Sequence, residues 1–200
     1  MNRLLTACPR LLAVLLLFTL LAPGVGAQGP IYADPVQRVG VDVAQAFGRN
    51  SDFDVLPLRI AWYSDWGTNP DPPRPGGMEY AQLITAMAGQ VPNKAWLQGL
   101  VAAYDPGSLW IVGNEPECPH QDRCTPEQYV AVYHRAYTYI KEVDPTAQVA
   151  IGGVVQATPL RLKWLDRVLS HYQATYGAPM PVDVWNVHNM ILPEGSNWGA

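Results

Sequence analysis

The sequence predicts an α/β fold built on parallel strands, and the pattern of its second half carries this prediction. Three short apolar runs rich in Val, Ile and Trp span residues 109–112, 149–155 and 182–187, and each follows a proline-containing turn. Fully buried parallel strands have this composition because helices cover both faces of their sheet. Longer amphipathic segments separate the runs, and this alternation favours right-handed βαβ units.

The first half predicts shorter and less regular elements. Residues 38–43 and 58–66 are strand candidates. Residues 67–77 are rich in proline and glycine, which interrupt both helix and strand, so a loop is expected there. Residues 79–87 are expected to begin as a strand, and residues 95–103 to form a short helix.

Two longer helices are predicted in the second half, and each starts at a Thr-Pro pair. Thr125 is expected to cap the first helix, with Gln128 closing a capping box, and Asp144, which precedes a proline, ends it. Thr158 is expected to start the second helix, and Gly177 suits the left-handed cap that ends it.

This pattern gives about six strands, which fit either a doubly wound sheet or a barrel. A closed eight-stranded barrel usually needs about 250 residues, and the chain has 200. From the pattern alone, either the sheet is open or the sequence is truncated.

Residues 1–27 have the layout of a secretory signal peptide. Arg3 and Arg10 come before the apolar run at residues 11–22. Pro-Gly ends the run, and small residues follow before Gln28. The run is shorter than the roughly 20 residues needed to span a bilayer, although an uncleaved anchor is the alternative. We therefore expect a secreted or extracytoplasmic protein with one domain over residues 28–200.

Charge excludes some partners. The formal net charge of the chain is −4, and removal of residues 1–27 would take two arginines and no acidic residue, which makes it −6. An acidic chain without a basic block is unsuited to nucleic acid or to an anionic membrane surface. We expect a monomer that binds neither.

The cysteines suggest a disulfide and no metal. Cys118 and Cys124 could close a short disulfide loop in an oxidising compartment, and two free thiols are the alternative. Together with His120 they offer only three zinc ligands, whereas a closed zinc site has four.

The most informative polar residues are Asn114 and Glu115, which directly follow the strand at residues 109–112. Polar side chains at the end of a buried strand are costly unless they are paired or used. Glycoside hydrolysis needs a carboxylic acid that protonates the departing oxygen. Burial among apolar residues favours the protonated form of such a group. The alternative is that the pair merely caps the next segment.

Residues 109–116, Leu-Trp-Ile-Val-Gly-Asn-Glu-Pro, resemble the fourth-strand signature of clan A glycoside hydrolases. The resemblance implies a (β/α)₈ TIM barrel, cleavage with retention of configuration, and no metal or organic cofactor. It assigns Glu115 as the acid/base and Asn114 as a substrate-binding amide. The substrate would be an oligo- or polysaccharide.

The same resemblance implies that the barrel is incomplete. It places His188 near the end of the sixth strand and facing the site, although a structural histidine bonded to backbone is the alternative. The family nucleophile is a glutamate that ends the seventh strand, and Glu117 and Glu194 do not match it. Glu117 is expected on the loop rim. The sequence would then hold about six of eight strand units, and alone it would be inactive.

Two tryptophans are candidates for stacking on sugar rings. Trp66 lies next to the proline-rich loop and Trp185 on the predicted sixth strand. Aromatic faces pack on sugars while the indole N–H can donate a hydrogen bond. Packing within the core is the alternative for both.

Two other classes of protein remain possible from the sequence. One is a secreted carbohydrate-binding barrel that has lost catalysis, which the residue at the end of a seventh strand would reveal. The other is an unrelated α/β protein with an open six-stranded sheet, which would leave the Asn-Glu pair unexplained.

Overall fold

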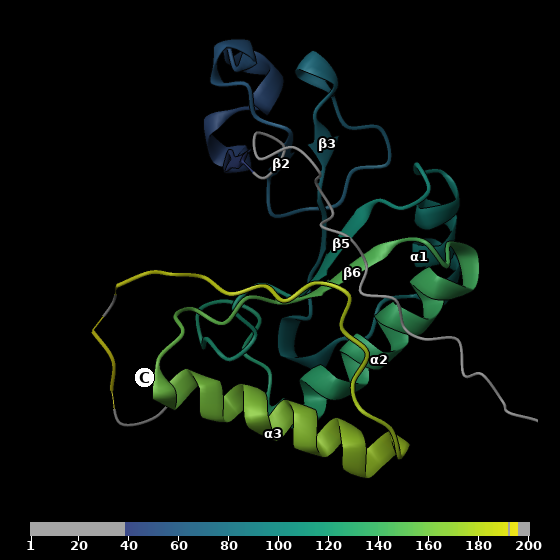
Figure 1. Ribbon diagram of the computed structural model, residues 1–200, viewed down its shortest axis with the longest axis vertical. Helices are drawn as coiled ribbons and strands as arrows, with labels where there is room; N and C mark the ends of the chain where they lie inside the picture. Colours follow the sequence, from purple (N-terminus) through teal and green to yellow (C-terminus); the bar gives the residue numbers. More distant parts are fainter. Residues whose placement is uncertain (1–38, 192, 196–200) are drawn as a thin grey trace, which may run out of the picture. The chain divides into compact units, whose positions relative to one another are not determined.

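The computed structural model describes residues 39–191 and 193–195 (Figure 1). These residues all belong to the unit that runs from Asp34 to Ala200. The predicted signal peptide, residues 1–27, lies outside the described residues. Within them, no helix combines the length and apolar character needed to cross a membrane.

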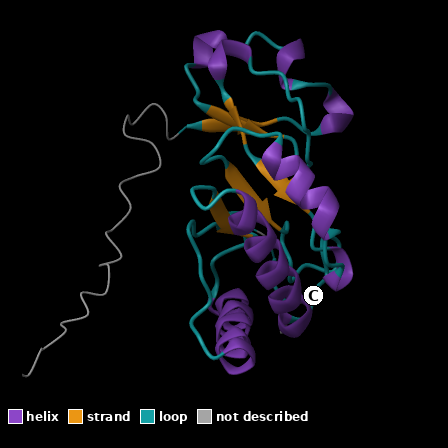
Figure 2. Cartoon of the chain, turned by 90° about the vertical axis from the view of Figure 1, so that its right-hand side faces the viewer, coloured by secondary structure: helices purple, strands orange, loops and turns teal. Residues whose placement is uncertain are grey.

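The described residues form six short strands, arranged in two three-stranded parallel sheets (Figure 2). The first sheet has the order β1 (Gly40–Asp42), β2 (Trp62–Ser64) and β3 (Glu79–Tyr80). The second has the order β4 (Gln82–Ile84), β5 (Leu109–Val112) and β6 (Gln148–Ile151). The predicted α/β fold with parallel strands is therefore confirmed.

These two sheets do not close into a barrel within the described residues. Ala81 alone separates β3 from β4, and its N–H donates to the carbonyl of Tyr63 at 2.9 Å. The N–H of Leu83 still reaches the carbonyl of Gly67, at 2.8 Å, but β4 pairs with β5. One extended segment thus changes partner at Ala81, which is why the ladder splits.

The described residues form three α-helices, and the two long ones begin and end at their predicted caps. The three helices are α1 (Lys94–Ala102), α2 (Pro126–Val143) and α3 (Pro159–Tyr176). The capping box of α2 is present, because the Thr125 side chain accepts from the Gln128 N–H at 3.2 Å and Gln128 reaches back. Both long helices therefore start where the Thr-Pro signals place them.

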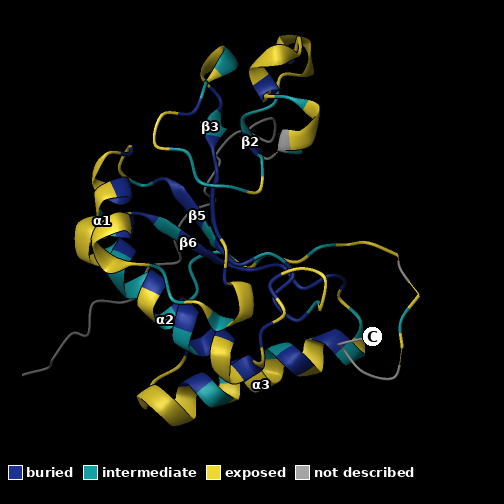
Figure 3. Ribbon diagram, turned by 180° about the vertical axis from the view of Figure 1, so that it is seen from behind, coloured by how far each residue is buried: buried dark blue, intermediate teal, exposed yellow. Residues whose placement is uncertain are grey.

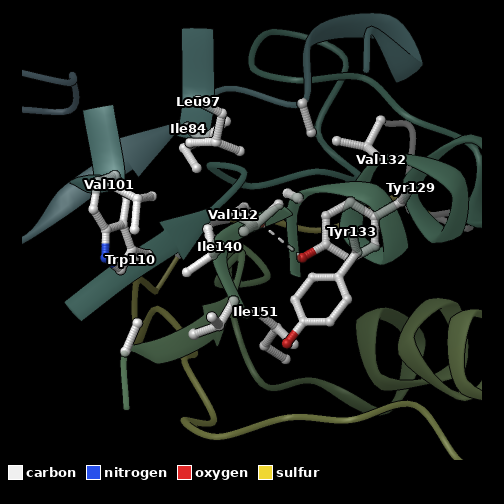
Figure 4. Close-up of a cluster of buried hydrophobic side chains, with 14 of the residues drawn as sticks. Ile84, Leu97, Val101, Trp110, Val112, Tyr129, Val132, Tyr133, Ile140 and Ile151 are labelled. Atoms are coloured by element: carbon white, nitrogen blue, oxygen red, sulfur yellow. Dashed lines mark hydrogen bonds between the residues drawn. The ribbon is translucent and has the colours of Figure 1, made fainter. Parts of the chain in front are cut away.

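The core lies between the second sheet and the helices. Side chains of β5 and β6 pack against apolar faces of α1 and α2, whose buried and exposed positions alternate along each helix (Figure 3). Figure 4 shows Trp110, Val112 and Ile151 within this core. Full burial of one large apolar side chain stabilises the fold by about 1.5–3 kcal/mol.

Tyr129 of α2 ties the ends of two strands together. Its hydroxyl donates to the carbonyl of Val112 at 2.8 Å (Figure 4). The same hydroxyl accepts from the N–H of Gly152 at 2.7 Å. It is fully buried, and burial raises the pKa of the phenol far above its usual range. The neutral hydroxyl therefore fixes the carboxyl ends of β5 and β6.

The predicted sixth strand, residues 182–187, is present only as isolated bridges. Val184 and Val187 bridge in parallel to Ala150 and Val154. The carboxylate of Asp183 accepts the N–H of Val149 at 2.9 Å, so a side chain occupies a position that a ladder carbonyl would take. The segment runs beside β6 without forming a continuous strand.

Candidate active site

The loop after β5 forms the site, and Gly113 makes its first turn possible. Gly113 has φ +94°, and its N–H donates to the carbonyl of Ile84 at 2.7 Å. A Cβ atom there would lie 3.1 Å from both Asp122 Oδ2 and the Tyr129 ring, so only glycine fits without adjustment. This turn carries Asn114 and Glu115 to the end of the strand.

The Glu115 backbone is held in an unfavourable conformation. Its φ is +44°, a left-handed value that costs a non-glycine residue roughly 1–2 kcal/mol. Two hydrogen bonds fix it: its N–H donates to the carbonyl of Gly153 at 3.1 Å, and its carbonyl accepts from Cys118 at 2.8 Å. Such outliers cluster at functional sites because the surrounding structure must enforce them.

The side chain of Glu115 is paired with His188. Glu115 Oε1 lies 2.9 Å from His188 Nδ1, and the Glu115 side chain is only 8% exposed. The His188 N–H donates to the carbonyl of Val154 at 3.0 Å. A Cβ atom on Gly153 would lie 2.7 Å from His188 Cδ2, so the glycine leaves the space that the imidazole occupies.

These groups open into a cavity of about 400 Å³. It is lined by Asp42, Trp66, Asn114, Glu115, Gln121, His188, Asn189 and Met190. Four of the five side chains proposed from the sequence are thus brought together from three parts of the chain. Trp185 is not among the lining residues and is 57% exposed.

Asp42 is a second carboxyl group in this cavity, and the sequence analysis missed it. It ends β1, so it occupies the carboxyl end of a parallel strand, as Glu115 does after β5. Burial raises the pKa of the Asp42 carboxyl, while the charge of His188 and a backbone hydrogen bond from Ser64 oppose that shift. Its place at a strand end was the available signal.

Asp122 organises the loop from within, and it too was missed. Its buried carboxylate accepts the N–H of Asn114 at 2.7 Å, the N–H of Ala86 at 3.0 Å and the hydroxyl of Thr85 at 2.8 Å. The loop after β5 is thereby tied to the segment after β4. These three hydrogen bonds offset the cost of burying the polar side chain.

The expectation that Glu117 lies on the loop rim is wrong. Glu117 is buried, and its Oε1 accepts the Val155 N–H at 2.8 Å and lies 3.2 Å from Arg161 of α3. Burial raises the pKa of the Glu117 carboxyl, and these partners oppose that shift. Arg161 also pairs with Glu194 at 3.0 Å, which places Glu194 outside the cavity. The buried guanidinium draws Glu117 inward.

The expected disulfide is absent from the structure. Cys118 and Cys124 are free thiols, and Cys124 is buried with its Sγ 3.0 Å from the carbonyl oxygen of Ala86. Burial raises the pKa of the Cys124 thiol to about 11, which favours an unreactive neutral group. Among the described residues no group of histidine, cysteine and carboxylate side chains could hold a metal ion.

A nearly buried carboxyl group beside a cavity at the ends of parallel strands could supply one of the two carboxyl groups that glycoside hydrolysis needs. The model of the glycosyl hydrolase catalytic core matches residues 43–191. The chain therefore belongs to the glycosyl hydrolase catalytic core family. No curated protein matches it.

Solved structures share the fold. The chain resembles a GH128 subgroup II endo-β-1,3-glucanase from Pseudomonas viridiflava, with 20% identity and a TM-score of 0.56, over 74% of this chain and 58% of that one. The corresponding enzyme from Sorangium cellulosum is 18% identical with a TM-score of 0.56, over 74% of this chain and 59% of that one. A GH128 subgroup I endo-β-1,3-glucanase from Amycolatopsis mediterranei, in complex with laminaritriose, is 20% identical with a TM-score of 0.52, over 73% of this chain and 54% of that one. The chain thus spans less than two thirds of each.

Proposed function

We propose that the protein is an exported glycoside hydrolase that cleaves O-glycosidic bonds with retention of configuration, and that Glu115 is its acid/base. One observation carries the proposal: the Glu115 carboxyl group lies in the loop directly after β5, is nearly buried, and borders a cavity beside His188. Membership of the glycosyl hydrolase catalytic core family supports the reaction class.

The proposed reaction has two steps with Glu115 in both. In the first, Glu115 donates its proton to the glycosidic oxygen while a second carboxylate attacks the anomeric carbon and forms a glycosyl-enzyme. In the second, Glu115 removes a proton from water, which displaces that carboxylate. His188 keeps the Glu115 side chain aimed at the cavity, and Asn114 hydrogen-bonds a sugar hydroxyl.

The nucleophile in this proposal is a glutamate that lies outside the described residues. In the clan that the sequence resembles, the nucleophile is the glutamate that ends the seventh strand. The two sheets would then be part of a (β/α)₈ barrel, and residues 28–200 alone would not hydrolyse substrate. Asp42 is the other carboxyl group in the Glu115 cavity. Trapping the covalent intermediate with a 2-fluoro glycoside and mapping the labelled peptide separates the two, because a label on Asp42 would contradict the proposal.

We propose β-1,3-linked glucans as the substrates to test first. The solved structures named above are endo-β-1,3-glucanases, and one of them holds laminaritriose. The signal-like segment at residues 1–27 supports export, which would bring the protein into contact with polysaccharides outside the cell. Export predicts that the mature protein lacks this segment, which N-terminal sequencing of secreted protein measures.

The anomeric form of the first product tests the reaction. The complete protein is mixed with a β-1,3-glucan oligosaccharide, and proton NMR follows the new reducing end before it mutarotates. Retention predicts the β anomer first. The α anomer would contradict the proposed mechanism, and binding without any hydrolysis would favour the non-catalytic binding barrel.

A further inference from the structure

Three cavities meet at Trp66. The cavity beside Glu115 shares Trp66, Asn114 and Gln121 with a second cavity of about 360 Å³. That second cavity shares Trp66, Leu83 and Thr85 with a third of about 280 Å³. Because they share lining residues, the three cavities are neighbours, and we refer to them together as the trench.

The backbone at Trp66 is strained where the trench needs a flat side chain. Trp66 has φ +61°, which is a true outlier for a bulky residue, and its side chain stays 43% exposed. The Trp66 N–H donates to Ser64 Oγ at 3.3 Å, and Asp65 accepts from the Gly67 N–H at 3.2 Å and from the Tyr80 hydroxyl. The fold therefore enforces a conformation that leaves an indole uncovered at the junction of the cavities.

A second exposed tryptophan lines the third cavity, which Glu115 does not border. Trp96 is 49% exposed and lines the third cavity from the first turn of α1. Its N–H donates to the capping side chain of Asn93 at 2.9 Å, so its backbone is fixed by the helix start. Two partly exposed indoles that line the same cavity offer apolar surface that a ligand can cover.

The walls between the two indoles suit sugar. Leu83, Ile84, Val91 and Pro92 supply apolar surface, and the same cavity carries polar groups that can bind hydroxyls. These are Thr68, Thr85, Gln90 and Asn93. Apolar faces combined with a few polar partners match the two kinds of surface on a pyranose ring.

We infer that this trench binds a polysaccharide chain over several consecutive sugar units, from the bond at Glu115 past Trp66 to Trp96. The inference rests on the proposed function, and it adds a binding surface that extends over several sugar units on one side of the scissile bond. Trp66 stacks on a unit near the reacting bond, and Trp96 on a unit at the distal end. Short oligosaccharides reach only the first of these.

Binding of oligosaccharides of increasing length tests the inference without relying on turnover. The complete protein carrying Glu115→Gln is titrated calorimetrically with laminari-oligosaccharides of three to seven units, with and without Trp96→Ala. Loss of one stacked unit is expected to weaken binding of the longest about tenfold and leave the shortest unchanged. Leu162→Ala, which removes an exposed apolar side chain from α3, is the control and should change neither.

The outcomes separate this inference from the proposed function. Length-dependent affinity that Trp96→Ala removes supports the trench, even if the wild-type protein proves not to hydrolyse. Equal weakening of short and long chains by Trp96→Ala, unchanged affinity for the long chains, or no binding at any length overturns it. Hydrolysis with affinity that does not depend on length would keep the proposed function and discard the trench.

Discussion

Glu115 and His188 form the smallest unit on which the account depends. The backbone N–H of His188 donates to the carbonyl of Val154, and the absence of a side chain at Gly153 leaves space for the imidazole. We propose that His188 acts as a positioning residue that restricts the Glu115 carboxyl group to orientations facing the cavity. A misplaced acid transfers its proton poorly, because general acid catalysis needs hydrogen-bond geometry.

Gly153→Ala should reproduce the loss caused by His188→Ala. The added Cβ would meet the imidazole, so both variants are expected to lower kcat roughly 10–100-fold with little change in KM. Steady-state kinetics on the complete protein measures this. Gly99→Ala is the matched control, since a Cβ there meets nothing within 4 Å and should stabilise α1 slightly. Normal kcat in Gly153→Ala would contradict the positioning role.

Backbone strain at Trp66 gives a second residue-level prediction. Trp66→Gly and Trp66→Ala both remove the indole, but only glycine adopts φ +61° freely. The glycine variant is expected to be about 1 kcal/mol more stable than the alanine variant, as urea unfolding measures. Both should lose sugar affinity equally. Equal stability would show that the left-handed backbone stores no strain.

At the scale of elements, the loop after β5 is fixed by buried charges. Arg161, in the first turn of α3, pairs with Glu117 in that loop and with Glu194 after the bridged segment. The Arg161 and Glu117 side chains are 5% and 0% exposed, so each needs the other to offset its desolvation. The Arg161 guanidinium thus joins α3, the loop after β5 and the later segment.

Arg161→Met should therefore destabilise the protein strongly. Removing one partner of a buried ion pair costs roughly 3–5 kcal/mol, because the other charge stays buried without compensation. Urea unfolding measures the loss. Adding Glu117→Gln to this variant is expected to recover part of the stability. A double variant no more stable than Arg161→Met would mean that charge burial is not the cause.

Local signals made the helices predictable, whereas distant contacts decided the rest. The caps at Thr125, Thr158 and Gly177 depend on residues within a few positions, so the sequence locates the helix ends. Glu117 was misplaced because its partner, Arg161, lies 44 residues away. Cys118 and Cys124 are free thiols, which was the alternative to the expected disulfide. A distant contact again decides the geometry, because the Cys124 thiol faces the carbonyl of Ala86.

At the scale of the molecule, residues that line the Glu115 cavity lie at or just after the C-terminal ends of strands. Asp42 ends β1, Trp66 follows β2, Glu115 follows β5, and His188 lies on the segment beside β6. Parallel strands bring such ends to one edge, so residues far apart in sequence line one cavity. The pairing of Asn114 and Glu115 with a strand end was visible in the sequence, whereas Asp42 and Gln121 needed the fold.

The most direct test of the account is the leaving-group dependence of Glu115→Gln in the complete protein. An oligosaccharide needs a proton on its departing oxygen, whereas an aryl glycoside with an acidic phenol does not. We predict that the variant loses about 10²–10⁴-fold in kcat on the oligosaccharide and far less on glycosylation by the aryl glycoside. Glu127→Gln, an exposed carboxyl change on α2, should alter neither. Near-normal turnover of the oligosaccharide by Glu115→Gln would contradict its role as the acid/base.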